Sequence, residues 1–391
     1  MEGPLTSPIF NAIVSSSPSS SPSVPANAKD LAHHEKSGKG FINPWESRKL
    51  KGEGKSPDTT PPTVPVRKPT FLTTRKNPHL RTTWLGHACY YVEFPSGLRV
   101  LFDPVFTDRC SPLSWLGPKR YTEMPCQIRD IPFIDAVIIS HNHYDHLSHP
   151  TILEIQRLHP NCHFFAPLGN KQWFDKSGVH KSTELDWWQS TNLTLTQGTS
   201  STPESRSLVV EAAKDVVASD IEATIQCLPC QHMSARSGWD KSQTLWASWA
   251  VTSGTKKLWF GGDTGYRSVP KLPVSEDDYD AKYDFPRCPA FKEIGEHAGP
   301  FDVGLIPIGA YVPRHVMSPM HANPFDSVNI FADTRCRRAL GMHWGTWVLT
   351  EEDVMEPPRL LREALKKKGL GEQGVFDVCD IGESREFKEE R

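Results

Sequence analysis

The feature that most constrains the fold is a cluster of metal-ligand residue types directly after an apolar segment. Residues 133–139 are mostly apolar, and the chain then reads Ser-His-Asn-His-Tyr-Asp-His-Leu over 140–147. This octapeptide holds four ligand-type side chains: His141, His143, Asp145 and His146. Imidazole and carboxylate groups suit zinc and related transition metals. Polar groups at the end of a core strand cost free energy unless something pairs them, so the pattern indicates a metal site, with a fortuitous His-rich turn as the weaker alternative.

Three more candidate ligands follow separate strand-like segments further along the chain. His232 ends Leu-Pro-Cys-Gln-His, Asp263 lies in Phe-Gly-Gly-Asp-Thr-Gly-Tyr, and His343 lies in Gly-Met-His-Trp-Gly-Thr. The glycines around Asp263 allow close approach of the backbone to a metal. Each residue alone is more often structural, so only the full set indicates a site. Asp103 and His87 are candidates to orient a metal-bound imidazole, with a plain turn as the alternative.

The remaining pattern predicts an α/β protein, because strand-like apolar runs alternate with segments of helical spacing. Strands are predicted at 83–94, 98–103, 133–140, 162–166, 223–228, 245–251, 257–260, 303–308 and 339–343. Helices are predicted at 152–158, 289–297, 323–333 and 358–368.

Composition divides the chain into an arm and a domain. Residues 1–66 are Ser/Pro-rich, then basic, and too poor in apolar groups to offset ordering entropy, so we expect a disordered arm. Its residues 41–45, Phe-Ile-Asn-Pro-Trp, form an apolar island suited to docking. Residues 67–391 are long enough for one large domain with a buried core. Polar segments near 198–220 and 271–287 are predicted to be insertions at its surface.

Charge and cysteine usage limit the partners and the compartment. The net charge of −2 gives no broad basic face and argues against nucleic acid. Residues 48–76 hold eight basic and two acidic side chains, which suits either anionic lipid headgroups or a solvated linker. Nine cysteines without a framework, and no signal-type or membrane-length apolar run, favour an intracellular protein, cytoplasmic or peripheral on an internal membrane.

The ligand pattern resembles the metallo-β-lactamase superfamily. Longer motifs are similar to the family of N-acylphosphatidylethanolamine-hydrolysing phospholipases D, from about residue 81 to residue 385 outside the two insertions. They include Thr-Trp-Leu-Gly-His-Ala at 83–88, Leu-Asp-Trp-Trp at 185–188, Gln-His-Met-Ser-Ala-Arg at 231–236 and His-Trp-Gly-Thr-Trp at 343–347. The resemblance implies an αββα sandwich of two mixed sheets flanked by helices. The chain departs from the family in its Ser/Pro arm, in the insertions and in Met320 before His321.

The resemblance also implies an activity. The family cleaves N-acylphosphatidylethanolamine into an N-acylethanolamine and a phosphatidic acid, at membranes, as a homodimer with two zinc ions per chain. Its ligand positions correspond to His141, His143 and His232 for one ion and to Asp145, His146 and His343 for the other, with Asp263 shared. Asp263 and Asp145 are accordingly the candidate catalytic carboxylates.

Residues that contact the substrate are harder to predict. The candidates are Tyr144, Arg236, Tyr311, Arg314 and His321. Arginine offers paired donors that match phosphate, although a surface salt bridge is an equal alternative for Arg236 and Arg314. We expect phosphodiester hydrolysis by water whose pKa two metal ions lower to about 7. A lactonase, thioesterase, nucleotide phosphodiesterase or ribonuclease on the same scaffold, a metal-binding protein without turnover, and an iron redox protein stay open as alternatives.

Overall fold

Two stacked β-sheets form the centre of the molecule. The structure is a computed structural model that describes residues 10–15, 23–45, 56–197, 220–273 and 275–388. The first sheet has the order β1-β8-β9-β10-β11-β12-β13-β14, with bounds Phe10–Ser15, Ser190–Gln197, Ile221–Leu228, Ser248–Ser253, Lys256–Phe260, Phe301–Pro307, Cys336–Met342 and Phe376–Asp377. The second has the order β15-β2-β3-β4-β5-β6-β7, with bounds Ser384–Phe387, Leu80–Trp84, Tyr90–Glu93, Arg99–Phe102, Ala136–Ile138, His163–Pro167 and Ser182–Leu185. Both sheets mix parallel and antiparallel pairs.

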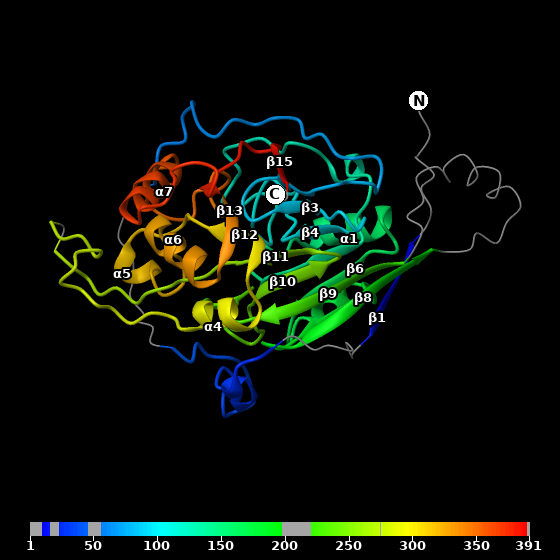
Figure 1. Ribbon diagram of the computed structural model, residues 1–391, viewed down its shortest axis with the longest axis horizontal. Helices are drawn as coiled ribbons and strands as arrows, with labels where there is room; N and C mark the ends of the chain where they lie inside the picture. Colours follow the sequence, from blue (N-terminus) through cyan, green and yellow to red (C-terminus); the bar gives the residue numbers. More distant parts are fainter. Residues whose placement is uncertain (1–9, 16–22, 46–55, 198–219, 274, 389–391) are drawn as a thin grey trace, which may run out of the picture.

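Helices cover the outer face of each sheet. Their bounds are α1 His149–Leu158, α2 Lys171–Lys176, α4 Ala290–His297, α5 Arg314–Met317, α6 Pro324–Asp333 and α7 Glu356–Lys367, with 3-10 helices η1 Ala26–Asp30 and η2 Ile128–Asp130. Helix α6 contacts β12 and β13 as well as α4 and α7, whereas α2 contacts β7 on the other sheet. Figure 1 shows α4 to α7 gathered on one side and α1 on the opposite side. The predicted αββα sandwich of two mixed sheets is confirmed.

The apolar pattern of the central strands explains the layers. In β5, Ala136 and Ile138 face the large core between the sheets, while Val137, and Ile139 just after the strand, face the smaller core beneath α1. Successive side chains of a strand point to opposite faces, so a strand buried on both faces reads as a continuous apolar run. This is why residues 136–139 are apolar without alternation, and why the chain emerging from β5 begins in the interior.

One predicted strand is two strands in the structure. Residues 83–94 were expected to be continuous, but β2 ends at Trp84 and β3 begins at Tyr90. Gly86 and His87 lie between them with positive φ angles of 99° and 51°. A left-handed backbone breaks an extended strand, and here the resulting turn directs His87 toward the ligand loops.

The described parts of the N-terminal arm differ from the expectation of disorder. Strand β1 pairs antiparallel with β8, with Phe10 opposite Gln197. Further along the arm, Phe41 and Val64 are buried in the main core. Trp45 stacks on Trp187 of the domain, with ring centroids 5.7 Å apart. Part of the arm's apolar surface therefore buries against the domain, which composition averaged over the whole arm does not reveal, whereas Ile13, Leu31 and Ile42 stay exposed.

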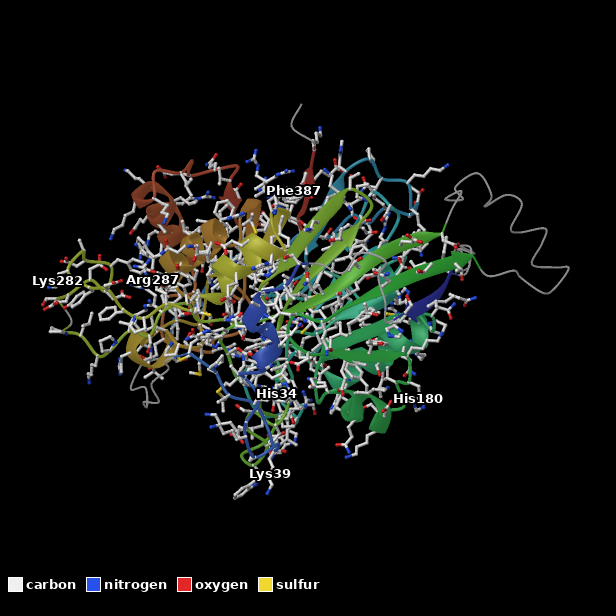
Figure 2. The ribbon with its side chains drawn as sticks, turned by 60° about the horizontal axis from the view of Figure 1, so that its bottom comes forward. His34, Lys39, His180, Lys282, Arg287 and Phe387 are labelled. Atoms are coloured by element: carbon white, nitrogen blue, oxygen red, sulfur yellow. The ribbon has the colours of Figure 1, made fainter. Side chains whose placement is uncertain are left out.

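The two predicted insertions have different outcomes. The segment near 198–220 lies outside the described residues except for Asp220. The segment 271–287, described apart from residue 274, extends from the side of α5 and α6 in Figure 1, and Figure 2 shows Lys282 at its outer edge. Its Asp278 accepts hydrogen bonds from Arg267 and Arg314, which tie the segment to the domain. In the described ranges, no helix is both long and apolar enough to cross a membrane.

Candidate metal centre

The sequence-predicted ligands lie at one edge of the sandwich. The loop 141–146 follows β5, His232 follows β9, Asp263 follows β11, and His343 follows β13. Strand β9 runs in the same direction as β11, because both are antiparallel to β10, and β11, β12 and β13 are parallel. The carboxyl ends of β9, β11 and β13 therefore open at the same edge of their sheet. The loop after β5, in the other sheet, meets them there, with His146 Nε2 3.1 Å from Asp263 Oδ2.

Three imidazoles form the first group. His143 Nδ1 lies 2.7 Å from His141 Nε2 and 3.3 Å from His232 Nε2. All three nitrogens lie within 4.8 Å of one another, and the side chains are buried or nearly so. Three nitrogens this close suit one ion, because each can reach it at a zinc–nitrogen distance of about 2.0–2.1 Å.

The second group contains Asp145, His146 and His343. Asp145 Oδ2 lies 3.4 Å from His146 Nε2 and 3.6 Å from His343 Nε2. His87, expected only to support the centre, lies 2.9 Å from the same carboxylate oxygen through Nε2. Its ligand-type atom also lies within 4.8 Å of those of the other three residues. His87 therefore orients Asp145 directly.

Asp263 lies between the two groups. Its Oδ2 atom is 3.6 Å from His232 Nε2 and 3.8 Å from His141 Nε2 in the first group. In the second group it is 2.9 Å from His343 Nε2 and 3.1 Å from His146 Nε2. A carboxylate within 4 Å of imidazole nitrogens of both groups suits a ligand shared by two ions.

Several ligand atoms of this centre have no hydrogen-bond partner. His146 Nε2, His343 Nε2 and Asp263 Oδ1 are buried and unpaired within the described structure, although the first two lie close to Asp263 Oδ2. Buried polar atoms in folded proteins are nearly always paired. A cation between these groups would satisfy the two imidazole nitrogens, so the residues fit a divalent metal.

The charges of the side chains at the centre also favour binding of a cation. Burial lowers the pKa of His141 and of His232 well below the ordinary value, so both are neutral at pH 7, the form that binds metal. Burial also lowers the pKa of His343, but the carboxylates of Asp263 and Asp145 outweigh it and raise the value to about 9. The negative charge of these two carboxylates would therefore also attract a divalent metal ion.

Hydrogen bonds behind the ligands fix their orientation. Asp103 Oδ2 lies 2.6 Å from His146 Nδ1, and Asp103 also accepts hydrogen bonds from the backbone N–H and the hydroxyl of Ser140. His232 Nδ1 faces the backbone carbonyl of Met320 at 2.9 Å. The sequence did not indicate Ser140 or the Met320 carbonyl. Ser140 stands directly before the histidine loop, whereas a backbone acceptor leaves no sequence signal.

Backbone geometry at the centre is unusual. Asp103 and His343, like His87, have positive φ angles, 39° and 62° respectively. Such backbone strain in non-glycine residues gathers at functional sites. Gly262 has a φ of +59°, and a Cβ atom there would come within 2.7 Å of Ser140 Cβ. Glycine is therefore required for Asp263 to approach the loop after β5.

Two of the predicted substrate contacts hold the metal loop. Arg236 Nη1 donates hydrogen bonds of 2.8 Å to the backbone carbonyls of Asn142 and Leu147. Its guanidinium lies over the ring of Tyr144, 4.0 Å from the centroid. These contacts bracket the 142–147 loop, so in this structure Arg236 positions the ligands rather than forming a surface salt bridge.

Of the other three predicted substrate contacts, one lies at the metal centre and two have partners elsewhere. His321 Nδ1 lies 4.0 Å from Asp263 Oδ2 and has no hydrogen-bond partner among the described residues. Arg314 is engaged by Asp278 and Asp326. The Tyr311 hydroxyl donates to Glu356 at 2.7 Å. The structure thus brings His321 to the centre, while Arg314 and Tyr311 have partners elsewhere.

Known proteins that are similar to this chain include a family of domains and a solved structure. Residues 98–344 match the Lactamase_B_2 family, described as a beta-lactamase superfamily domain. Igni18, a metallo hydrolase of the archaeon Ignicoccus hospitalis, is 19% identical, with a TM-score of 0.48 over 80% of this chain and 99% of that chain. The family match, the two-sheet fold and the ligand cluster define a metal-dependent hydrolase of the metallo-β-lactamase superfamily.

Sequence relatives narrow the family. N-acyl-phosphatidylethanolamine-hydrolyzing phospholipase D 1 of Caenorhabditis elegans is 34% identical over 327 residues, which cover 82% of this chain and 80% of that protein. The mitochondrial N-acyl-phosphatidylethanolamine-hydrolyzing phospholipase D of Saccharomyces cerevisiae is 34% identical over 300 residues. That match covers 76% of this chain but only 53% of the yeast protein. The chain belongs to the family of N-acylphosphatidylethanolamine-hydrolysing phospholipases D.

Proposed function

We propose that this protein is a zinc-dependent phosphodiesterase that hydrolyses N-acylphosphatidylethanolamine to an N-acylethanolamine and a phosphatidic acid. The observation that carries the proposal is the convergence of all seven ligand-type side chains at one edge of the sandwich, in a chain with the family relationship described above. Other hydrolases share the scaffold, so the proposed substrate class rests on the sequence relatives. The geometry of the ligand-type side chains supports hydrolysis as the type of reaction.

The donor set favours zinc. One ion would be held by His141, His143 and His232, and the other by Asp145, His146 and His343, with Asp263 shared. Five imidazoles and two carboxylates suit zinc, whereas magnesium and calcium prefer oxygen donors. Bound zinc would lower the pKa of water to about 7 and stabilise charge on phosphate oxygens.

Residues of the chain would orient the attacking water. Asp263 Oδ1 is buried without a hydrogen-bond partner in the described structure, so it is available to accept a hydrogen bond from that water. Asp145 is held in place by His87. The unpaired Nδ1 of His321, next to Asp263, is available for a phosphate oxygen of the substrate.

A lipid substrate implies binding to a membrane surface. Within residues 111–117, Leu113, Trp115 and Leu116 are exposed, and Trp239 on another loop is 92% exposed. Tryptophan favours the interface between membrane and water. We therefore propose that the protein binds peripherally to a membrane, with these loops as candidates for contact with lipid. An internal membrane and a homodimer are also part of the proposal, and they rest on the sequence pattern and the family resemblance.

The decisive assay uses the purified full chain and vesicles containing N-acylphosphatidylethanolamine. We expect chelator-sensitive release of N-acylethanolamine, identified by mass spectrometry, and about two zinc ions per chain that are lost when both His141 and His343 are replaced. In water labelled with oxygen-18, attack at phosphorus places the label in phosphatidic acid. Faster turnover of a lactone, thioester or nucleotide would reassign the substrate class. A zinc content of one ion or none per chain, together with no turnover, would favour the alternative of a metal-binding protein without catalytic activity.

A further inference from the structure

A second cluster of ligand-type side chains joins the N-terminal arm to the domain. Asp186 Oδ1 lies 2.6 Å from His33 Nε2, and Asp186 Oδ2 lies 2.6 Å from His34 Nε2. The three ligand-type atoms lie within 4.8 Å of one another, and none belongs to the groups described above. We propose that His33, His34 and Asp186 form a further metal site, for a divalent transition metal such as zinc, that clamps the arm onto the domain.

The local chain path brings two neighbouring imidazoles to one carboxylate. Successive side chains of an extended chain point to opposite sides, so this convergence needs a turn. Leu31 has a φ of 47°, and the N–H of His34 donates to the Leu31 carbonyl. His34 then pairs with Phe41 across a tight loop. Figure 2 shows His34 beside the body of the molecule and Lys39 at the outer end of this loop.

Aromatic packing holds the ligands in place before any ion binds. The ring of His33 stacks on Trp187, with centroids 4.1 Å apart, and Phe41 packs edge-on against His34 at 5.1 Å. His33 and Asp186 are buried, whereas the side chain of His34 is 32% exposed. Locked rotamers make a site rigid, and the exposed side of His34 leaves a path for an ion from solvent.

The donor set is that of a three-ligand transition-metal site. Two imidazole nitrogens and one carboxylate oxygen bind zinc or iron while leaving positions open for water. Binding through Nε2 requires each neutral imidazole to carry its proton on Nδ1. Each neutral imidazole would release its Nε2 proton to solvent and take one up at Nδ1, so two hydrogen bonds to Asp186 would be replaced by coordinate bonds without net proton loss.

The clamp would act on the metal centre through the arm. Asn43, shortly after this loop, donates a side-chain hydrogen bond of 2.8 Å to the backbone carbonyl of His232. The N–H of Phe41 donates to the Ser242 carbonyl, also at 2.8 Å. An ion at the further site would therefore hold the arm against the segment that carries His232.

Counting metal ions tests the site without measuring activity. The full chain and its variants are dialysed against zinc and their metal content is measured. We expect His34→Ala and Asp186→Asn each to bind about one ion fewer than the wild type. His180→Ala, which removes an imidazole with a 79% exposed side chain, should bind as many as the wild type. Equal zinc content in the wild type, His34→Ala and Asp186→Asn would overturn the proposal.

Trypsin cleavage in the loop gives a second readout. Lys36 and Lys39 are exposed, and we expect zinc in excess of its dissociation constant to slow cleavage there ~10-fold in the wild type. In His34→Ala, zinc should fill the catalytic centre without protecting the loop. If zinc protects the wild type and His34→Ala equally, or neither, hydrogen bonds alone hold the arm. Neither readout uses a lipid substrate, so the proposed function can fail independently.

Discussion

The carboxylate of Asp103 accepts a hydrogen bond from Nδ1 of His146 at 2.6 Å, which leaves Nε2 of that imidazole 3.1 Å from Asp263 Oδ2. Neither residue needs to touch a substrate for this contact to matter. A partner on one ring nitrogen fixes both the tautomer and the direction of the other nitrogen. The residue that holds a ligand is therefore as much part of the centre as the ligand itself.

Asp103→Asn should weaken metal binding roughly 10- to 100-fold. The amide of asparagine places an N–H₂ group where Asp103 now accepts hydrogen bonds from His146 and Ser140. Competition with a chromophoric chelator measures the affinity, and circular dichroism reports the fold. Asp108→Asn, which changes a largely exposed aspartate, is the matched control. Unchanged affinity in Asp103→Asn would mean that His146 does not depend on this contact.

Asp263→Asn should reduce turnover more than ~100-fold while the fold is kept, because metal charge stabilisation contributes several kcal/mol to the barrier. Asparagine cannot supply the negative charge that Asp263 places between the two groups of imidazoles. The zinc content should fall together with the activity. A variant that retains two ions and full activity would exclude Asp263 as the shared ligand and as a partner of the attacking water.

The residues of the candidate centre could be predicted because each lies shortly after a strand whose apolar composition is visible in the sequence. His232, Asp263 and His343 lie far apart in the chain, and only the common direction of β9, β11 and β13 brings them together. The family resemblance supplied this topology. The apolar run before His141 predicted burial of the loop without any structure.

Other features depend on contacts that leave no local pattern. Arg236 bonds to the backbone carbonyls of Asn142 and Leu147, and any residue has a carbonyl. Strand β1 is short, stands in a Ser/Pro-rich arm and finds its partner β8 only after folding. For Arg314 the sequence leaves a phosphate contact and a salt bridge as equal alternatives, and in the structure its guanidinium pairs with Asp278 and Asp326.

Arg236→Lys separates positioning of the loop from binding of phosphate. Lysine keeps the charge but loses the planar donors that reach the carbonyls of Asn142 and Leu147. Hydrogen bonds from charged groups contribute about 1.5–3 kcal/mol, so we expect metal to dissociate ~10-fold faster or more. A raised KM with unchanged metal release would instead assign Arg236 to the substrate.

Removal of metal should lower the thermal stability of the whole domain. Ions at the candidate centre would bind the folded state, and ligand at 100 times its dissociation constant stabilises by about 2.7 kcal/mol. Chelator should therefore lower the Tm measured by differential scanning calorimetry, and added zinc should restore it. The same treatment of a variant lacking both His141 and His343 should produce a much smaller shift. An equal shift would locate the effect outside the centre.

Asp326→Asn should lower the free energy of unfolding at neutral pH. It should also make that free energy less dependent on pH in the acidic range. Asp326 is fully buried and accepts hydrogen bonds from Arg267 at 2.9 Å and Arg314 at 2.7 Å. Burial alone would raise the pKa of Asp326, but these two arginines and the Tyr279 hydroxyl hold it below its ordinary value. Breaking a buried ion pair by removing one partner costs about 3–5 kcal/mol.

The sign of the pH effect follows from the lowered pKa of Asp326. A carboxylate with a lower pKa in the folded state stabilises the fold above its unfolded pKa of about 3.9. That contribution is lost as the pH falls through the folded value, so the wild type should lose more stability between pH 7 and strongly acidic pH than Asp326→Asn. Urea unfolding across this range measures the difference. Asp284→Asn, where the side chain is 92% exposed, should follow the wild type. If the free energies of unfolding of the wild type and Asp326→Asn fall in parallel with pH, Asp326 does not contribute to the loss of stability in acid.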